Sequence, residues 1–260
     1  MELGGNTVLI TGGARGIGLE LAKQFLAKGN KVIITGRDQK NLEKAQDQLN
    51  GVVAIQSDVG NPDDIRELYL KIEQDHPDLN ILINNAGIMK KVNLQEHQHS
   101  PEALTQEIDI NVKGPIWMTD MFLPLLKKQK KSAVVNVSSA LAFVPLPISP
   151  VYCATKSALH SYTLSLREQM RNTQVSVFEL APPATETDIL GEFSEDDMEG
   201  TTAMTTPDMV AIFMAGFAKD NYEICPGQSN QLRFMGRFFP KFILKQLSKN
   251  LAAMHSAMGR

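Results

Sequence analysis

A tyrosine and a lysine one helical turn apart are the residues of this chain best suited to chemistry. Tyr152 and Lys156 stand four positions apart in the segment VYCATKSALHSY. Four residues advance an α-helix by roughly 400°, so the two side chains leave the same face. A tyrosine hydroxyl has an ordinary pKa of about 10, and a nearby ammonium favours its ionised form. We therefore expect Lys156 to lower the pKa of Tyr152, so that the pair acts as a proton donor with its activator.

A glycine-rich loop precedes this pair in the chain. The segment TGGARGIG at 11–18 follows a β-branched run and leads into a predicted helix, the context of a dinucleotide-binding loop. Gly12 permits the turn, Gly16 lets the backbone approach a pyrophosphate, and Gly18 lets helix and strand pack closely. The spacing G-x-x-x-G-x-G differs from the more familiar G-x-G-x-x-G. For the loop taken alone, a simple turn is the alternative.

Two arginines favour a phosphorylated dinucleotide. Folds that bind NAD usually carry an acid about 20 residues beyond the glycines, where it bonds the ribose 2′-hydroxyl. Here the corresponding segment is TGRD, with Arg37 in that neighbourhood and Arg15 inside the glycine loop. Because guanidinium groups bind phosphate oxygens through paired N–H donors, we expect NADP (NADPH) rather than NAD. The open alternative is that the arginines are solvated surface charges and that Asp38 neutralises Arg37.

Short β-branched runs alternate with amphipathic segments along the chain. Strands are predicted at 7–11, 31–35, 52–56, 79–84, 132–138 and 175–180. Helices are predicted between them at 16–29, 38–50, 61–76, 101–128 and 150–171. Six strands joined by helices indicate an α/β protein with a parallel sheet covered on both faces. The right-handed crossover rule then gives a doubly wound, Rossmann-type fold, with residues 1–260 in a single domain.

The composition excludes several classes of protein. A hydrophobic fraction of 43 % with 21 % charged residues is ordinary for a soluble globular chain, and a net charge of −3 gives no footprint for nucleic acid. Only two cysteines occur, Cys153 and Cys225, and MELGGNTVLI lacks the features of a signal peptide. We therefore expect a cytoplasmic protein. No cluster of metal-ligating side chains is visible in the sequence, so no metal is expected.

Several motifs occur in an order that resembles the single-domain branch of the short-chain dehydrogenase/reductase superfamily. Across residues 7–190 they are Thr11-Gly12 with Gly16 and Gly18, Asn84-Asn85-Ala86-Gly87, Asn111, Ser139, and Tyr152 with Lys156. Within the superfamily, LITGG, GIGLELAK, VYCATK and LAPP are most similar to the DltE-like oxidoreductases of Gram-positive bacteria. The resemblance implies a carbonyl reductase or alcohol dehydrogenase that acts on a small molecule, and the two arginines make NADP its expected cofactor.

By this resemblance, four residues would carry the reaction. Tyr152 would protonate the carbonyl oxygen as hydride arrives from the nicotinamide, or take the proton in the oxidation direction. Lys156 would also bond the nicotinamide ribose, and Ser139, thirteen residues before Tyr152, would hold the substrate oxygen. Asn111 would bind a water that links Lys156 to solvent. Ser138, the serine that precedes Ser139 in the chain, is expected to point to the opposite face of the sheet.

The resemblance also implies a larger set of cofactor contacts. Asp58 would accept a hydrogen bond from the adenine amino group, with a turn-forming role as its alternative, and Val59 would contribute its backbone. Pro183 stands where the family usually has glycine, so the nicotinamide-side loop must differ locally. The full set expected to bind the cofactor is Thr11, Gly12, Arg15, Gly16, Ile17, Gly18, Arg37, Asp58, Val59, Asn85, Ala86, Gly87, Tyr152, Lys156, Pro182, Thr185 and Thr187.

Two segments are expected to enclose the substrate. The apolar stretch FVPLPISP at 143–150 would form one wall. Residues 188–205 follow the cofactor loop and are predicted to form a lid whose acids, Asp197 among them, face solvent. An apolar or amphipathic carbonyl compound suits such a site.

The tail at 226–260 is basic, with cations at every fourth position from 233 to 249 beside phenylalanines, interrupted by Pro240. On a helix this spacing makes a cationic stripe. Docking onto the acidic body or a partner subunit is favoured over peripheral membrane contact, which stays an alternative. The resemblance implies a homo-oligomer. The alternative function is a nonenzymatic NADP-binding sensor or interaction protein that uses this tail.

Overall fold

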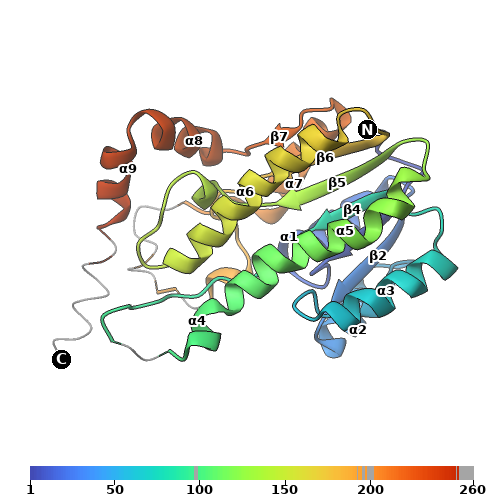
Figure 1. Ribbon diagram of the computed structural model, residues 1–260, viewed down its shortest axis with the longest axis horizontal. Helices are drawn as coiled ribbons and strands as arrows, with labels where there is room; N and C mark the ends of the chain where they lie inside the picture. Colours follow the sequence, from blue (N-terminus) through green and yellow to red (C-terminus); the bar gives the residue numbers. More distant parts are fainter. Residues whose placement is uncertain (97–98, 192, 195–196, 198–201, 250, 252–260) are drawn as a thin grey trace.

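A parallel sheet lies at the centre of the molecule, with helices on both sides (Figure 1). The computed structural model describes residues 1–260 except 97–98, 192, 195–196, 198–201, 250 and 252–260. The strands are β1 (Thr7–Thr11), β2 (Lys31–Gly36), β3 (Val53–Gln56), β4 (Ile81–Asn84), β5 (Ser132–Val137), β6 (Val175–Leu180) and β7 (Glu223–Ile224). The strands predicted from the sequence are confirmed, and β7 is an addition.

The strand order creates a crevice for a ligand. Within the described residues the sheet has seven strands in the order β3-β2-β1-β4-β5-β6-β7, all paired in parallel. Strand β1 pairs with β2 on one side and with β4 on the other. The chain therefore leaves β1 and β4 in opposite directions, which opens a crevice outside their carboxyl ends. The predicted doubly wound α/β fold is confirmed.

Helices cover the two faces of the sheet in separate groups. They are α1 (Gly16–Ala27), α2 (Gln39–Gln48), α3 (Pro62–Asp75), α4 (Pro101–Ile108), α5 (Gly114–Lys127), α6 (Pro150–Met170), α7 (Thr206–Ala218), α8 (Gln228–Phe238) and α9 (Pro240–Leu247). One core joins α1, α2 and α7 to the sheet, and a second joins α3, α5 and α6 to its other face. Alternate strand residues serve the two cores: Val8 and Ile10 enter the first, and Leu9 enters the second.

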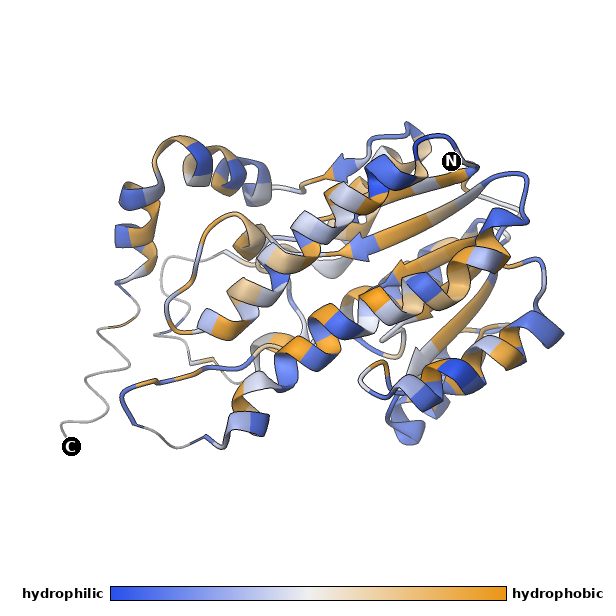
Figure 2. Cartoon of the chain, in the orientation of Figure 1, coloured by the Kyte–Doolittle hydropathy of each residue, from blue (hydrophilic) through white to orange (hydrophobic). Residues whose placement is uncertain are grey.

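Figure 2 shows the same division by hydropathy, with hydrophobic strands inside and hydrophilic residues on the outer sides of α2 and α3. These helices begin where the sequence provides caps. The side chain of Asn61 accepts a hydrogen bond from the Asp63 N–H at 3.0 Å, and Pro62 follows the cap as the first helical residue. Of the helices in the described part of the chain, none combines the length and apolar character needed to cross a bilayer.

The predicted long helix 101–128 is wrong in one respect. A π-helical turn at Asp109–Lys113 separates α4 from α5, and the Gly114 N–H bonds the Asp109 carbonyl five residues back. Pro115 has no N–H to donate to the carbonyl of Asn111, four residues earlier, so the regular α-helical hydrogen-bond pattern lacks one bond at this turn. Such π-turns occur often at functional sites. Here the turn contains Asn111.

Candidate active site

The end of β5 and the beginning of α6 bring the predicted catalytic side chains together. Ser139 follows β5, Tyr152 and Lys156 lie in the first two turns of α6, and all three are buried. The Ser139 side chain adjoins the Tyr152 hydroxyl closely enough to lower the pKa of that phenol. The Ser138 hydroxyl instead donates to Glu179 Oε1, on the neighbouring strand β6, at 2.5 Å. Ser139 is therefore the serine that meets Tyr152, as the spacing predicted.

Lys156 is fixed at the bottom of this site. Its Nζ donates to the Val137 carbonyl at 2.9 Å and lies 5.5 Å from the centroid of the Tyr152 ring. Burial lowers the pKa of Lys156 to about 8, while the carboxylates of Glu107 and Glu179 oppose that fall. At neutral pH the ammonium form therefore still predominates.

The expectation that Tyr152 has a lowered pKa is wrong for this structure. Burial raises the pKa of Tyr152 above its ordinary value, because a phenolate loses its hydration there, and the adjoining Ser139 side chain offsets only part of the rise. The ammonium of Lys156 is held by a backbone carbonyl rather than by the phenol oxygen. The phenol is consequently protonated at neutral pH and is a proton donor rather than a preformed base.

Asn111 holds the site together from the π-turn. Its side chain is fully buried, accepts the Ile88 N–H at 2.9 Å and donates to the Ile88 carbonyl at 2.8 Å. Its amide also donates to Thr155 Oγ1 at 3.1 Å, and that hydroxyl donates to the Tyr152 carbonyl at 2.7 Å. Asn111 thus links the segment after β4 to the turn of α6 that carries Tyr152. A Cβ at Gly87 would lie 3.3 Å from Asn111 Oδ1, so this glycine permits the close contact.

The glycine loop has the geometry of an anion cradle. Gly12 and Gly16 have φ angles of 62° and 53°. A Cβ at Gly12 would lie 2.8 Å from Ala86 Cα, and one at Gly16 would lie 3.1 Å from Thr187 Cγ2. Helix α1 follows Arg15 with no side-chain cap and no acid in its first turn. Its N–H groups and positive dipole end therefore fit a dinucleotide pyrophosphate.

Thr11 and Asn85 join this loop to β4 across the crevice. The Thr11 hydroxyl accepts the N–H groups of Asn85 and Ala86, each at 3.0 Å. The Asn85 amide donates to the carbonyls of Thr11 at 2.9 Å and Gly12 at 3.1 Å. The predicted cofactor residues at the ends of the two strands therefore lie together. The side chains of Thr11 and Asn85 thus fix the backbone of the glycine loop against the segment after β4.

The predicted adenine contacts lie at the end of β3. Asp58 Oδ1 accepts the Gly60 N–H at 2.8 Å, which is the turn-forming role that the sequence left open. Val59 is buried against Gly114, where a Cβ would lie 3.0 Å from the Val59 carbonyl oxygen. Ile17 is half-buried in the first turn of α1. The structure thus gives Asp58 a local role, and its contact with adenine stays a prediction.

The two arginines expected to select the cofactor are exposed. Arg15 Nη1 lies 3.5 Å from Asp188 Oδ2 in an open ion pair, whose contribution to stability is small. Asp38 Oδ1 accepts the Asn41 N–H at 3.0 Å and caps α2. Among the ion pairs of the described residues, none joins Asp38 to Arg37. The guanidinium groups are therefore accessible to a phosphate.

The loop after β6, which contains Pro183, is held by several hydrogen bonds to backbone carbonyls. The Pro182 carbonyl accepts the Ala140 N–H at 2.8 Å, which ties the loop to the turn after Ser139. The buried Thr185 donates its hydroxyl to the Pro183 carbonyl at 2.9 Å, and the Thr187 hydroxyl donates to the Thr185 carbonyl at 3.2 Å. Thr187 also lies against Gly16 of the glycine loop, so this part of the predicted cofactor set is contiguous.

The predicted lid differs from expectation at Asp197. This residue is buried, and Lys91 Nζ lies 2.7 Å from each of its carboxylate oxygens, which holds its pKa below the usual range although burial opposes this. The prediction that Asp197 faces solvent is therefore wrong, because a cation from the segment after β4 supplies its partner. The other lid acids, at 192, 195–196 and 199, lie outside the described residues.

Sequence reasoning missed three polar residues of the site. Thr155 joins Asn111 to α6. The buried carboxylates of Glu107 and Glu179 limit the fall in the pKa of Lys156 that burial causes. Glu179 also accepts from Ser138 and bonds His160 Nδ1 at 2.8 Å, which raises the pKa of His160. An acid inside the apolar run VSVFEL was the available signal for Glu179.

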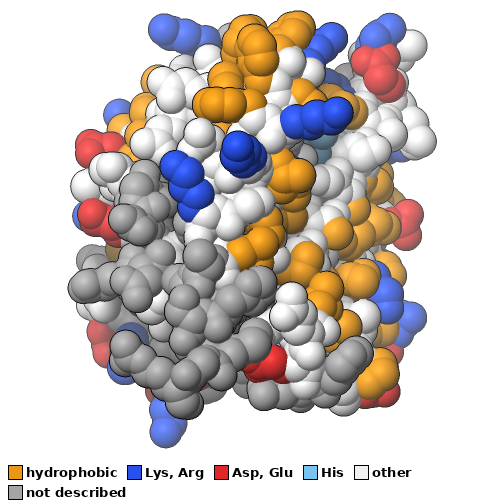
Figure 3. All heavy atoms as spheres, turned by 90° about the vertical axis from the view of Figure 1, so that its left-hand side faces the viewer, with side chains coloured by type: hydrophobic (Ala, Val, Ile, Leu, Met, Phe, Trp, Pro, Cys, Tyr) orange, Lys and Arg blue, Asp and Glu red, His pale blue; other side chains and the backbone are white. Residues whose placement is uncertain are grey.

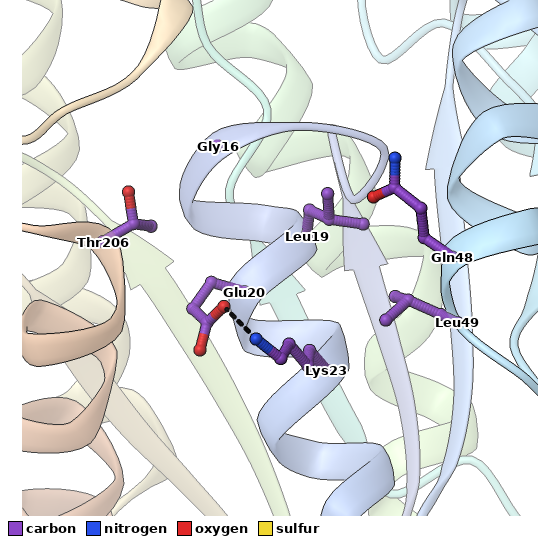
Figure 4. A pocket seen from close by; sticks show the side chains of 7 residues that line it. All are labelled: Gly16, Leu19, Glu20, Lys23, Gln48, Leu49 and Thr206. Atoms are coloured by element: carbon purple, nitrogen blue, oxygen red, sulfur yellow. Dashed lines mark ion pairs between the residues drawn. The ribbon is translucent and has the colours of Figure 1, made fainter.

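A pocket of about 500 Å³ lies outside this site, beside the glycine loop (Figure 4). The side chains around it come from α1, the end of α2 and the start of α7, with an ion pair between Lys23 and Glu20 at 3.5 Å. Gly16 is its one member from the predicted cofactor set. We assign it no part in the reaction.

Comparisons with known proteins identify the family. The model of the short chain dehydrogenase family matches residues 6–198. The uncharacterized oxidoreductase DltE of Bacillus subtilis is 41 % identical over 90 % of this chain and 92 % of its own. The NADP-dependent 3-hydroxy acid dehydrogenase YdfG of Salmonella typhi is 33 % identical over 78 % and 85 %.

Solved structures give the same result for the fold. A short chain dehydrogenase from Burkholderia cenocepacia in complex with NADP superposes with a TM-score of 0.82, at 24 % identity, over 95 % of this chain and 99 % of its own. The 3-ketoacyl-(acyl-carrier-protein) reductase of Brucella melitensis, complexed with NADH, superposes with a TM-score of 0.75, at 28 % identity, over 84 % and 93 %.

Proposed function

The chain belongs to the short chain dehydrogenase family of oxidoreductases, and from that membership we propose that it transfers a hydride between NADP and a carbonyl or alcohol substrate, with Tyr152 as acid and base. The observation that carries the proposal is the buried Tyr152 phenol, which adjoins Ser139 and Lys156 at the carboxyl end of β5. General acid catalysis requires a protonated donor in a fixed position, and this phenol is both.

When bound, the dinucleotide supplies or accepts the hydride. The hydroxyls of Ser139 and Tyr152 would together hold the carbonyl oxygen, and Tyr152 would donate its proton as negative charge develops there. Lys156, whose Nζ lies 5.5 Å from the centroid of the Tyr152 ring, would bond the nicotinamide ribose. Asn111 and Thr155 act through position, because they fix the α6 backbone at Tyr152.

The residues that would hold the dinucleotide are those of the crevice. The N–H groups at the start of α1 would bind the pyrophosphate, and the exposed Arg15 and Arg37 would bind a 2′-phosphate. A named relative is NADP-dependent and one solved neighbour is a complex with NADP, whereas another carries NADH. The preference of this chain for NADP therefore rests on Arg15 and Arg37.

Arg37→Ala is expected to raise the KM for NADPH roughly tenfold or more and to change the KM for NADH little. Hydrogen bonds to charged groups contribute about 1.5–3 kcal/mol each, and 1.4 kcal/mol corresponds to a factor of ten. Lys40→Ala removes another exposed cation nearby and is the control. Equal changes for the two cofactors would contradict a contact between Arg37 and the 2′-phosphate.

The activity itself is tested by following nicotinamide absorbance with a panel of aldehydes, ketones and alcohols, NADPH or NADP being supplied with each. Reduction or oxidation of a panel member is the expected result. Binding of NADPH without turnover of any member would instead support a nonenzymatic sensor. Cytoplasmic location, homo-oligomerisation and the lid role of 188–205 stay predictions.

A further inference from the structure

Helices α8 and α9 carry an exposed aromatic patch, defined as Phe234, Phe238, Phe239 and Phe242. Their exposed fractions are 56 %, 58 %, 52 % and 54 %, although phenylalanine is usually buried in a folded domain. The rings of Phe234 and Phe238 lie 4.8 Å apart, and those of Phe234 and Phe239 lie 6.3 Å apart. Three of the rings are therefore in contact, and the Phe242 N–H bonds the Phe239 carbonyl at 3.1 Å, so the fourth follows them within one turn. Exposed apolar patches of this kind mark interaction surfaces.

Cations surround this patch. Arg237, Lys241, Lys245 and Lys249 are all exposed, and among the ion pairs of the described residues none includes them. Figure 3 shows hydrophobic side chains beside Lys and Arg on the face that includes these helices, and Figure 2 shows both kinds of residue alternating along α8 and α9. The chain has no acid after Glu223.

The inner side of α8 is already occupied by the body of the protein. Arg233 pairs with Glu223 and lies 5.8 Å from the Phe143 ring, and Ser229 is fully buried. A Cβ at Gly236 would lie 2.3 Å from the Phe143 carbonyl oxygen, so the helix is in close contact there. Docking on the body therefore uses Arg233 and leaves the aromatic patch on the outside.

We propose that the aromatic patch and its four cations bind the surface of an anionic lipid bilayer. Phenylalanines beside basic residues on short helices are typical of interfacial segments: the rings enter the boundary of the acyl region, and the cations meet lipid phosphates. The whole chain has net charge −3, and the part after Glu223 has six basic and no acidic residues, which leaves −9 for residues 1–223. Because of this uneven charge, an anionic surface attracts α8 and α9 and repels the rest of the protein.

A symmetric contact between two copies fits the patch less well. It would bring the cations of both copies together without an acid on either side to neutralise them. An anionic bilayer supplies both an apolar interior and a negative surface. Helix α8 also packs on Phe143, which lies between Ser139 and Tyr152 in the chain. Docking through α8 would therefore bring the segment between these two residues toward the lipid.

The test is cosedimentation of the full chain with vesicles of equal parts phosphatidylcholine and phosphatidylglycerol, compared with pure phosphatidylcholine. Binding is expected with the anionic vesicles and is expected to weaken as salt is raised. Lys241→Glu with Lys245→Glu should weaken it more than tenfold, because each basic residue near such a surface contributes roughly fivefold. Phe238→Ser with Phe242→Ser should weaken it roughly tenfold or more.

Matched controls lie far along the chain, on exposed positions of other helices. Leu70→Ser on α3 removes an exposed apolar side chain, and Lys40→Glu with Lys44→Glu on α2 reverses two exposed cations. Both should bind anionic vesicles as the natural chain does. The proposal is overturned by no binding of the full chain to anionic vesicles, by equal loss in the controls, or by patch variants that bind normally. The proposal is also overturned if the natural chain forms an oligomer without lipid and the patch variants are monomeric, because the patch would then be a contact between copies.

Discussion

Tyr152→Phe is expected to bind NADPH with nearly unchanged affinity and to lose turnover by about a thousandfold. The substitution deletes the hydroxyl that we propose as the proton donor, while the ring keeps its packing in the buried site. General acid catalysis typically contributes a factor of about 10²–10⁴, and this phenol is assigned all of it. Turnover is followed by nicotinamide absorbance, and the dissociation constant of NADPH by fluorescence titration.

Tyr162→Phe is the matched control for this variant. Tyr162 lies on the same helix, α6, is partly buried, and its hydroxyl adjoins Thr119 rather than a residue of the site. Its removal should leave both turnover and NADPH affinity within about twofold, because surface and peripheral hydroxyls contribute little to the transition state. If Tyr152→Phe keeps a tenth of the natural turnover, Tyr152 is not the proton donor.

The order of strands and helices could be predicted because its signals are local. β-Branched runs and helical periodicity identify an element from a few neighbouring residues, so β1 to β6 and the central helices were found. Strand β7 has only two residues, Glu223 and Ile224, and a pair has no periodicity. Helix α7 was missed although Thr205 and Pro207 form a cap and first turn, since the apolar run that follows faces more than one direction.

The meeting of Ser139, Tyr152 and Lys156 was predictable for a similar reason. The end of a buried strand and one face of the next helix follow from chain order, and in a parallel sheet both lie at the carboxyl edge. The protonation of these groups was not predictable. It depends on burial and on Glu107 and Glu179, which reach Lys156 from α4 and β6 through tertiary packing.

The same distinction explains the errors at the π-turn and the lid. The apolar pattern of 101–128 is helical throughout, and the interruption lies beside Pro115, which has no N–H for the carbonyl of Asn111. Asp197 stands in an acidic segment typical of a solvated surface, yet Lys91, over a hundred residues away, pairs with it in a buried contact. Single residues decide both features, and averages over a segment do not detect them.

Gly18→Ala is expected to destabilise the protein by about 1–3 kcal/mol and to lower its melting temperature by roughly 3–10 °C. A Cβ at this position would lie 2.3 Å from the Gly12 carbonyl oxygen and 2.5 Å from Asn85 Nδ2. These two atoms are themselves hydrogen-bonded at 3.1 Å, so neither can move without opening the link between the glycine loop and β4. The higher helix propensity of alanine, worth about 1 kcal/mol, offsets only part of the clash.

Gly36→Ala isolates this effect from the general consequences of adding a methyl group. At Gly36 the nearest neighbour of an added Cβ is Leu42 Cδ2 at 3.7 Å, an ordinary contact, so the melting temperature without cofactor should stay near that of the natural protein. Thermal unfolding followed by circular dichroism measures both variants. A Gly18→Ala protein as stable as Gly36→Ala would mean that the loop shifts away from α1. The close packing at Gly18 would then not be what holds the loop at the end of β4.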